Sequence, residues 1–247
     1  MIENKISQWL REYAEQNNIQ TLVVGVSGGI DSAVTSTLCA MTGIPTIAVN
    51  LPLHSKQTNT GLSNKHLRWL SDLYPNVKID VVCMDAIYDA FEASLEKYEN
   101  DLGYANSKSR IRMVALYQIA AHTRGMVVGT GNKVEDFGVG FFTKYGDGGV
   151  DISPIADLTK TQVRELAANL GIAEEIIEAP PTDGLWEDSR SDEQQIGASY
   201  KELEWVMEHL SRAHEMELTR RQKDVINIYN KFHTKNGHKM RAIPVFK

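Results

Sequence analysis

The chain has 247 residues, and its 42% hydrophobic and 23% charged content is ordinary for a globular protein. No apolar run approaches the roughly eighteen residues that a membrane helix needs, so the sequence predicts no membrane span. The net charge of −6 disfavours bulk electrostatic binding of nucleic acid or of anionic membranes. Any phosphate that this protein binds must therefore be held by local features.

Residues 1–17 have no basic start followed by an apolar block, so they do not predict a signal peptide. Their apolar residues fall at helical spacing instead, which predicts an amphipathic helix. The two cysteines, Cys39 and Cys83, lie in apolar surroundings and are expected to be small buried residues. A disulfide framework or a zinc cluster would need more cysteines, and a reducing cytoplasm fits this usage.

Short runs rich in Val and Ile predict buried strands, and helical patterns lie between and after them. The expected strands are 21–26, 45–51, 77–83 and 126–129, and the expected helices are 31–42, 60–73, 85–98, 106–124, 160–170, 199–211 and 215–233. This alternation predicts an α/β fold with a doubly wound, mostly parallel sheet and helices on both faces. No repeat or linker divides the chain, so we expect one domain over 1–247. Such sheets bind ligands beyond the carboxyl ends of their strands.

The stretch "GVSGGIDS", residues 25–32, falls at that edge, directly after the first expected strand. Its glycines permit a tight turn whose backbone N–H groups can point at one anion, and the next helix adds its positive N-terminus. Asp31 would repel a phosphate unless Mg²⁺ stood between them. The alternative is a glycine-rich turn in which Asp31 or Ser32 merely caps the helix.

Three cations, Lys108, Arg110 and Arg112, lie near the start of the expected helix 106–124. Cations at a helix N-terminus oppose the helix dipole, so either an anionic ligand lies nearby or the stretch is a solvated basic surface.

Further along the chain, Thr130 follows the fourth expected strand and Glu135 follows a few residues later. Glu135 could complete a metal site with Asp31. A helix near 160–170 begins with a plausible capping box formed by Thr159 and Gln162. Residues 178–198 predict a long loop of the kind that often forms a lid, and the basic tail 235–246 predicts irregular structure.

Seven segments, taken together and in order, resemble the NAD synthetase family of PP-loop ATP pyrophosphatases. They are "GVSGGIDS", "NSKSRIRM", "VVGTGNKVE", "FFTKYGDGGVD", "LTKTQV", "APPTDGLW" and "GHKMR". The most specific is "TKYGDGG". The resemblance implies a Rossmann-like fold of the adenine nucleotide alpha hydrolase type. It also implies ATP-dependent amidation of deamido-NAD (nicotinate adenine dinucleotide) with ammonia through an adenylated carboxylate, releasing AMP and pyrophosphate.

The resemblance also implies a role for each matching residue. ATP would be bound by Gly25, Val26, Ser27, Gly28, Gly29, Ile30, Asp31, Ser32, Thr130, Lys160 and Thr182. Deamido-NAD would be bound by Arg110, Lys144, Asp151, His238 and Lys239. Asp31 and Glu135 would hold Mg²⁺. The catalytic set would be Asp31, Lys160 and Asp147, in which Lys160 replaces the lysine that the phosphate loop lacks and Asp147 receives the incoming ammonia. Ser109 stands where the family commonly has alanine.

Family members are homodimers with dinucleotide sites at the interface, and some carry a nitrilase-like glutaminase domain. Because the loop begins near residue 25, no such domain is expected before it, and we expect a cytoplasmic ligase that uses ammonia directly. Two alternatives remain open: another PP-loop amide-forming or RNA-thiolating enzyme, and a non-catalytic nucleotide-binding module. The two cysteines and the acidic charge disfavour a thiolating enzyme, and a nucleotide-binding module would not need Asp31, Glu135, Asp147 and Lys160 together.

Overall fold

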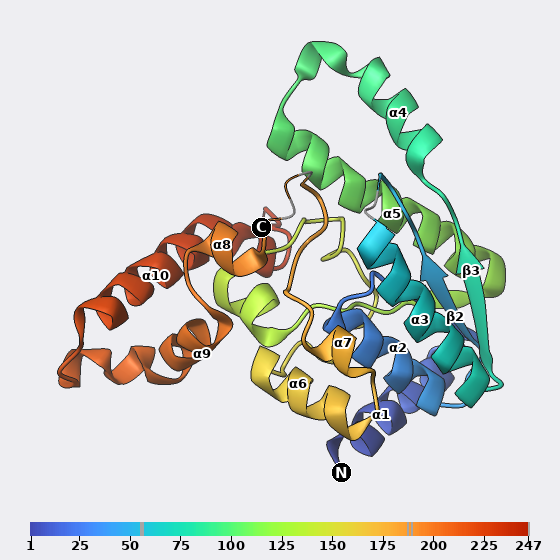
Figure 1. Cartoon of the computed structure of the whole chain (residues 1–247), viewed down its shortest axis with the longest axis horizontal. Helices are drawn as coiled ribbons and strands as arrows, with labels where there is room; N and C mark the ends of the chain where they lie inside the picture. Colours follow the sequence, from blue (N-terminus) through green and yellow to red (C-terminus); the bar gives the residue numbers. More distant parts are fainter. Residues whose placement is uncertain (55–56, 187, 189, 247) are drawn as a thin grey trace.

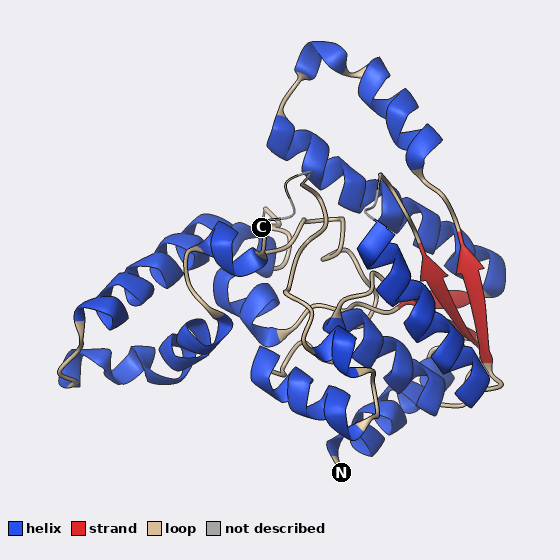
Figure 2. Ribbon diagram, viewed as in Figure 1, coloured by secondary structure: helices blue, strands red, loops and turns tan. Residues whose placement is uncertain are grey.

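The computed structural model describes residues 1–54, 57–186, 188 and 190–246, with side chains for all of these except 57–60. Within this part of the chain, a parallel sheet is surrounded by helices (Figures 1 and 2). Its strands are β1 (Thr21–Gly25), β2 (Thr46–Asn50), β3 (Val77–Val81) and β4 (Gly125–Val127). The helices are α1 (Ile2–Gln16), α2 (Ile30–Met41), α3 (Gln57–Leu73), α4 (Asp85–Ser94), α5 (Asp101–Thr123), α6 (Lys160–Asn169), α7 (Glu174–Ile177), α8 (Asp192–Ile196), α9 (Tyr200–His209) and α10 (Arg220–Met240). Two 3₁₀ helices are η1 (Glu96–Tyr98) and η3 (Leu210–Glu215), and η2 (Val134–Val139) is a π-helix.

The sheet has the strand order β3-β2-β1-β4, with all neighbours parallel. The chain builds outward from β1 to β2 and β3, then returns to place β4 on the other side of β1. The order therefore reverses between β1 and β4, and ligands bind at such switch points in open α/β sheets. The predicted phosphate turn follows β1 and Thr130 follows β4, so both lie at this point.

Successive side chains of β1 point to opposite faces of the sheet, as the geometry of a strand requires. Leu22 and Val24 pack in a cluster with residues of α1, α2, α3, α6 and α7. Val23 packs on the other face with Tyr88 of α4 and Leu116 of α5. Because both faces are covered, the doubly wound α/β fold predicted from the sequence is confirmed.

A third hydrophobic cluster joins residues of η2, α8, α9 and α10 with Ala198, which lies between α8 and α9. Figure 1 shows α9 and α10 on the side of the molecule away from β2 and β3. The cluster joins Val139 of η2, Leu203 of α9, and Val225 and Tyr229 of α10. Gly138 allows η2 to pack closely, since a Cβ there would lie 2.8 Å from the sulfur of Met207. The segment that carries Glu135 is thus anchored in this helical cluster rather than in the sheet.

Two expectations about burial were wrong. The strand 77–83 was expected to be buried, but β3 is the edge strand, and Ile79 and Val81 are 40% and 55% exposed. Cys39 is buried as expected, whereas Cys83 is exposed. Both errors concern residues in β3 or directly after it, at the edge of the sheet. An edge strand can contain the same apolar residue types as a central strand, although it has a neighbouring strand on one side only.

Two expectations about irregular structure also need correction. The segment 178–198 contains a short helix, α8, which begins with a capping box between Ser191 and Gln194. Helix α10 continues to Met240, so His238 and Lys239 lie in its last turn rather than in an irregular tail. Packing supports this extension, because Asn236 Nδ2 donates a hydrogen bond of 2.9 Å to the carbonyl of Val139.

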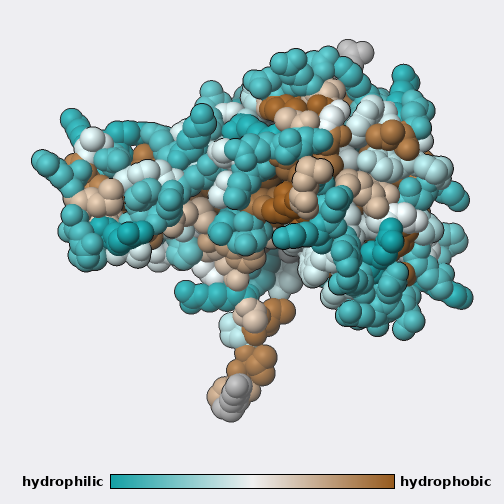
Figure 3. Space-filling model, turned by 90° about the horizontal axis from the view of Figure 1, so that it is seen from below, coloured by the Kyte–Doolittle hydropathy of each residue, from teal (hydrophilic) through white to brown (hydrophobic). Residues whose placement is uncertain are grey.

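The irregular part of the tail begins at Arg241, and its apolar residues are open to solvent. Ile243, Val245 and Phe246 are 64%, 76% and 101% exposed. Figure 3 shows an extended segment with hydrophobic side chains projecting from the body of the molecule. Among the described residues, no helix combines the length and the apolar character that crossing a membrane requires.

Candidate active site

The turn after β1 is held in shape by its own two serines. Ser32 Oγ donates to the carbonyl of Gly29 (2.9 Å) and accepts from the N–H of Ser27 (3.2 Å). The hydroxyl of Ser27 in turn accepts from the N–H of Gly29 (3.2 Å). Gly28 has φ of 93°, a value that L-residues with side chains rarely adopt. The positive N-terminus of α2 therefore opens onto the switch point, as an anion site requires.

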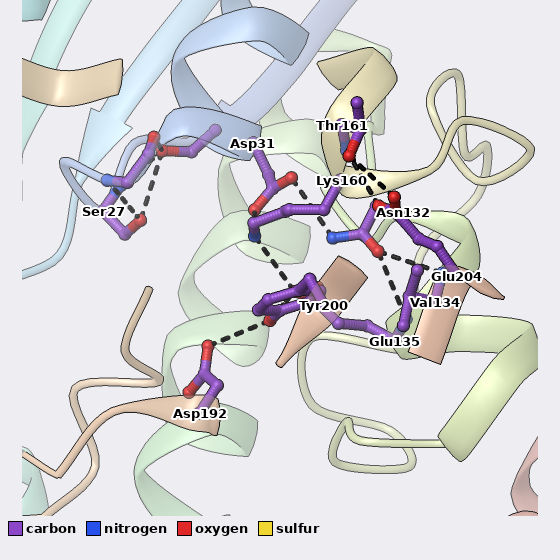
Figure 4. A network of polar contacts seen from close by, with 12 residues as sticks. Ser27, Asp31, Asn132, Val134, Glu135, Lys160, Thr161, Asp192, Tyr200 and Glu204 are labelled. Carbon is purple, nitrogen blue, oxygen red and sulfur yellow. Dashed lines mark hydrogen bonds and ion pairs between the residues drawn. The ribbon is translucent and has the colours of Figure 1, made fainter. Parts of the chain in front are cut away.

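Lys160 joins the phosphate turn to the π-helix. Its Nζ lies 2.5 Å from Asp31 Oδ2 and 3.1 Å from Glu135 Oε1, and its side chain is 2% exposed (Figure 4). Lys160 is the first residue of α6, and the predicted capping box between Thr159 and Gln162 is confirmed. This box fixes where the helix starts and so directs Lys160 inward.

The charges of this group depend on one another. Burial alone would lower the pKa of Lys160, but the carboxylates of Asp31 and Glu135 raise it well above its usual range. Burial raises the pKa of Asp31, which the ammonium of Lys160 lowers and the charge of Glu135 raises again. Lys160 is therefore a permanent cation whose neutralising partners are the two carboxylates predicted to bind metal.

Asn132 connects the carboxylate of Asp31 to the backbone of η2 through hydrogen bonds and is itself fully buried. Its Nδ2 donates to Asp31 Oδ1 (3.3 Å), while its Oδ1 accepts from the backbone N–H groups of Val134 (3.0 Å) and Glu135 (3.2 Å). These bonds provide acceptors for the backbone N–H groups in the first turn of η2. Short π-helical segments such as η2 often occur at functional sites. The position of Glu135 relative to Asp31 is thus set by one amide side chain.

Asp31 and Glu135 fit the way proteins bind Mg²⁺ together with a nucleotide. Mg²⁺ is usually held by one or two carboxylates plus substrate phosphates and water, not by an all-protein cage. Within the described part of the chain, no group of three or more acidic, histidine or cysteine side chains is arranged around one point. The donor set therefore suits a metal that arrives with phosphates, and Lys160 would have to yield part of its contact with both carboxylates.

Asp147 lies at a second position of the same cavity, where two donors hold its carboxylate. Ser109 Oγ donates to Asp147 Oδ1 (2.7 Å), and the N–H of Thr143 donates to the same oxygen (3.0 Å). The loss of bulk water raises the pKa of Asp147, and the bond from Ser109 lowers it in part. Gly146 permits the contact, since a Cβ there would lie 2.3 Å from Ser109 Oγ.

The cations predicted to bind the second substrate gather along one wall of the cavity. Arg110 Nε donates to the carbonyl of Lys144 (3.2 Å), and Lys144 Nζ donates to the carbonyl of His238 (3.3 Å). Lys239 Nζ donates to the carbonyl of Phe142 (2.6 Å), and burial lowers the pKa of Lys239. Residues from α5, from the turn after η2 and from α10 thus meet, although more than a hundred positions separate Arg110 from His238.

One cavity of about 1330 Å³ contains almost all of the residues predicted for the site. Its lining includes Gly25, Val26, Ser27, Gly28, Gly29, Ile30, Asp31, Ser32, Arg110, Thr130, Glu135, Lys144, Asp147, Lys160, Thr182, His238 and Lys239. A pocket for one drug-sized ligand is typically about 300–1,000 Å³, so this cavity has room for two substrates. Lys108, Arg110 and Arg112 also line it. Helix α5 begins at Asp101, so these cations lie inside the helix and not near its start as expected, and their place in the cavity wall favours the anionic-ligand interpretation over a solvated surface.

Asp151 is the predicted site residue that does not line this cavity. Its Oδ2 accepts from the N–H of Val127 (2.7 Å) at the end of β4, and its Oδ1 accepts from Tyr117 Oη (3.0 Å). In this arrangement its carboxylate stabilises the end of a strand, and its role toward a substrate stays a prediction.

Sequence reasoning assigned no role to Tyr200, Asp192 or Asn132. Tyr200 Oη donates to Glu135 Oε1 (2.5 Å) and lies 3.3 Å from Asp192 Oδ2 (Figure 4). Asn132 belongs to the quoted segment "VVGTGNKVE", so the sequence offered a signal for it, whereas no local pattern marks Tyr200.

The hydrogen bond of Ser109 explains why this chain departs from the alanine that is common in the family. A serine at this position can donate a hydrogen bond to Asp147, and an alanine cannot.

A parallel, doubly wound sheet with a serine-glycine turn after β1 and a large cavity at its switch point defines a nucleotide-binding α/β enzyme. The NAD synthase family model matches residues 2–243. An NH(3)-dependent NAD(+) synthetase of Carboxydothermus hydrogenoformans is 40% identical over 206 residues, which cover 81% of this chain and 82% of that protein. The chain belongs to the NAD synthase family.

Solved structures of this fold agree over the whole chain. The NMN synthetase of Francisella tularensis has a TM-score of 0.88 at 29% identity, over 99% of this chain and 96% of its own. The NH3-dependent NAD synthetase of Campylobacter jejuni, solved with nitrate, has a TM-score of 0.81 at 25% identity, over 100% of this chain and 97% of its own.

Proposed function

We propose that this protein is an ammonia-dependent NAD synthetase, which amidates deamido-NAD at the expense of ATP. The observation that carries the proposal is the single cavity that joins the phosphate turn, the Asp31–Lys160–Glu135 group and Asp147. The relatives named NH(3)-dependent NAD(+) synthetase support the nitrogen source. Membership of the family makes ATP the second substrate.

The reaction has two steps that need different groups. A carboxylate oxygen of the substrate attacks the α-phosphorus of ATP, and the bond to the β-phosphate breaks with release of pyrophosphate. Ammonia then attacks the activated carbonyl carbon, AMP leaves with the bonding electrons, and one proton is lost from the nitrogen. Carboxylates resist direct attack by amines because oxide is a poor leaving group, and adenylation provides a better one.

The residues of this chain would divide these tasks between them. The turn at 27–29 and the N-terminus of α2 would bind the departing pyrophosphate through backbone N–H groups. Lys160 would move from the carboxylates toward the phosphates and stabilise the charge that develops there. Asp31 and Glu135 would hold Mg²⁺, which supplies charge neutralisation at the phosphate oxygens. Asp147 would bind ammonium and accept the proton that ammonia releases.

A second candidate substrate is nicotinate mononucleotide, because the structure with a TM-score of 0.88 is titled an NMN synthetase. Both substrates present the same nicotinate carboxylate, and they differ in the presence of an adenylate group. The cation wall formed by Arg110, Lys144 and Lys239 can bind the phosphates of either one, so the test must compare the two.

The test is an assay of the full chain with ATP, Mg²⁺, ammonium and either deamido-NAD or nicotinate mononucleotide. The proposal requires formation of NAD and AMP in equal amounts and a higher kcat/KM with deamido-NAD. A higher kcat/KM with the mononucleotide would replace the proposed substrate, and an absence of AMP with both would refute the proposed reaction. Glutamine in ammonia-free buffer is expected to give no product, and equal rates with glutamine would contradict the ammonia assignment.

We also propose a cytoplasmic homodimer that binds neither nucleic acid nor membranes. Helix α5 supports a dimer, since Val114 and Tyr117 are 70% and 38% exposed on it. Light scattering after gel filtration tests the dimer, and a mass of about 28 kDa, that of the single chain of 27.6 kDa, would refute it.

A further inference from the structure

Tyr200 touches three charged groups of the site at once. It is 1% exposed, and its hydroxyl lies 2.5 Å from Glu135 Oε1 and 3.3 Å from Asp192 Oδ2. The ammonium of Lys160 lies 4.7 Å from the centroid of the same ring. Figure 4 shows these side chains converging from α9, η2, α6 and α8.

The hydroxyl and the ring have separable effects. A hydroxyl has one hydrogen, and the shorter contact assigns it to Glu135, where a charge-assisted bond fixes the carboxylate in one orientation. The face of the ring attracts the ammonium of Lys160 through a cation–π contact. One residue therefore orients both a predicted metal ligand and the lysine that competes with the metal for it.

Asp192 extends this arrangement to residues 179–186, which also line the cavity. The N–H of Asp192 donates to the carbonyl of Pro181 (3.0 Å), two residues from the cavity-lining Asp183. Asp192 is 6% exposed, and among the described residues its Oδ1 has no hydrogen-bond partner. A buried carboxylate without full hydrogen bonding is costly, so its retention beside Tyr200 points to a role.

Burial raises the pKa of Asp192 to about 7, with further contributions from the charges of Glu135 and Asp183. In its protonated form Asp192 can donate to the oxygen of Tyr200, which then donates to Glu135. Hydrogen bonds arranged in such a chain strengthen one another.

We propose that Tyr200 is a positioning residue of the metal and phosphate site, and that Asp192 acts through it. Its hydroxyl holds Glu135 in the orientation that binds the cation, its ring holds Lys160, and Asp192 couples both to the cavity-lining residues 179–186. The inference rests on the proposed function, because it presumes that Asp31 and Glu135 bind the metal.

The direct test measures Mn²⁺ binding by electron paramagnetic resonance in the presence of α,β-methylene-ATP, which cannot be cleaved between its α and β phosphates. Tyr200→Phe keeps the ring and removes the hydroxyl, and we expect Mn²⁺ affinity to fall about 10- to 100-fold, as for other groups that orient metal ligands. The KM for MgATP should rise in parallel. The matched control is Tyr229→Phe, which makes the same change in a buried tyrosine of the third cluster, stacked on His233.

The role of Asp192 is tested in the same assay. Asp192→Ala should weaken Mn²⁺ binding about five- to tenfold, the effect of one lost hydrogen bond. Asp192→Asn can still donate an N–H to the oxygen of Tyr200 and should bind Mn²⁺ within about twofold of the wild type. In the Tyr200→Phe background, Asp192→Ala should cause no further loss, because the two residues act in series.

Three outcomes would overturn the inference. Wild-type Mn²⁺ affinity in Tyr200→Phe, an equal loss in Tyr229→Phe, or additive losses in the double variant each contradict the positioning role. If the wild type binds Mn²⁺ with the nucleotide and Asp31→Asn does not weaken that binding, the metal assignment of the proposed function fails as well. Failure of the positioning role alone leaves Asp31→Asn impaired and Tyr200→Phe normal, so the two failures are distinguishable.

Discussion

The ammonium of Lys160 lies 2.5 Å from Asp31 Oδ2, although 129 positions separate the two residues in the chain. The protein's own cation thus pairs with the carboxylates that are predicted to bind Mg²⁺. The turn after β1 has no lysine in its own sequence, but Lys160 at the start of α6 lies close to it through its contact with Asp31. Under the proposed function, binding of the nucleotide with Mg²⁺ would require an exchange of partners: the carboxylates would pass to the metal and the lysine would pass to the phosphates.

Lys160→Met should separate the two consequences of this exchange. Activity should fall at least about 100-fold, as expected when a principal electrostatic contact of the transition state is removed. Mn²⁺ binding without nucleotide should become tighter, because the competing ammonium is gone. Steady-state rates and Mn²⁺ titration measure the two effects. Weaker Mn²⁺ binding in Lys160→Met would contradict a competition between lysine and metal.

Asp31→Asn should weaken binding of the metal and nucleotide together and lower the rate by more than about tenfold. The amide keeps the size of the side chain but loses the charge that both Lys160 and Mg²⁺ require. Calorimetric titration with Mg²⁺ and α,β-methylene-ATP measures the change. Asp157→Asn is the control, since Asp157 pairs with Lys133 with its side chain 94% exposed, and it should match the wild type.

Ser109→Ala should raise the pKa of Asp147, because it removes a hydrogen bond that favours the charged form. Loss of one such bond corresponds to about 1–2 kcal/mol, so the KM for ammonium should increase about five- to thirtyfold near neutral pH. The acidic limb of the rate profile should move to higher pH, where the carboxyl is again ionised. An unchanged profile and an unchanged KM would show that Asp147 does not act on the nitrogen source.

His66 predicts a loss of stability in mild acid. It is 2% exposed, forms a 2.9 Å hydrogen bond with Ser36, and burial lowers its pKa from 6.5 to about 4. Between these values the unfolded chain binds the extra proton, so the free energy of unfolding falls as the pH drops from 6.5 to 4. The contribution is roughly 3 kcal/mol and is fully present above pH 6.5.

Urea unfolding at several pH values measures this effect. His66→Gln should flatten the dependence between pH 6.5 and 4, whereas His122→Gln at an exposed position should leave it unchanged. The same slope in His66→Gln and in the wild type would assign the acid sensitivity to other groups.

Local signals in the sequence predicted the fold and the turn after β1, and the resemblance to NAD synthetases supplied most of the other residues that line the candidate site. Strands β1, β2 and β4 follow from apolar runs, and the turn at 27–29 follows from its glycines. The edge position of β3 could not be predicted, since Ile79 and Val81 would look the same in a central strand. Helix α10 was cut short in the prediction because Asn236 and Gly237 are poor helix formers, and packing against η2 outweighs that weakness.

The residues that were missed have long-range contacts. Tyr200 meets Glu135 across 65 positions, and only the packing of α9 on η2 brings them together. Asp192 reaches Tyr200 because a capping box at Ser191 starts a helix inside a segment expected to be a loop. Such contacts arise from tertiary structure and leave no periodic pattern.

The third cluster also predicts how this protein would lose activity on heating. Glu135 lies on η2 and Tyr200 on α9, two elements of the third cluster, whereas Asp31 lies on α2, which packs in the cluster of the sheet. The proposed site therefore spans two separately packed cores. Partial loosening of the smaller core would disassemble it while the sheet stays intact. Heat inactivation should thus precede the loss of the circular dichroism signal. Cross-links between η2 and α6 should delay inactivation more than substitutions that stabilise the sheet.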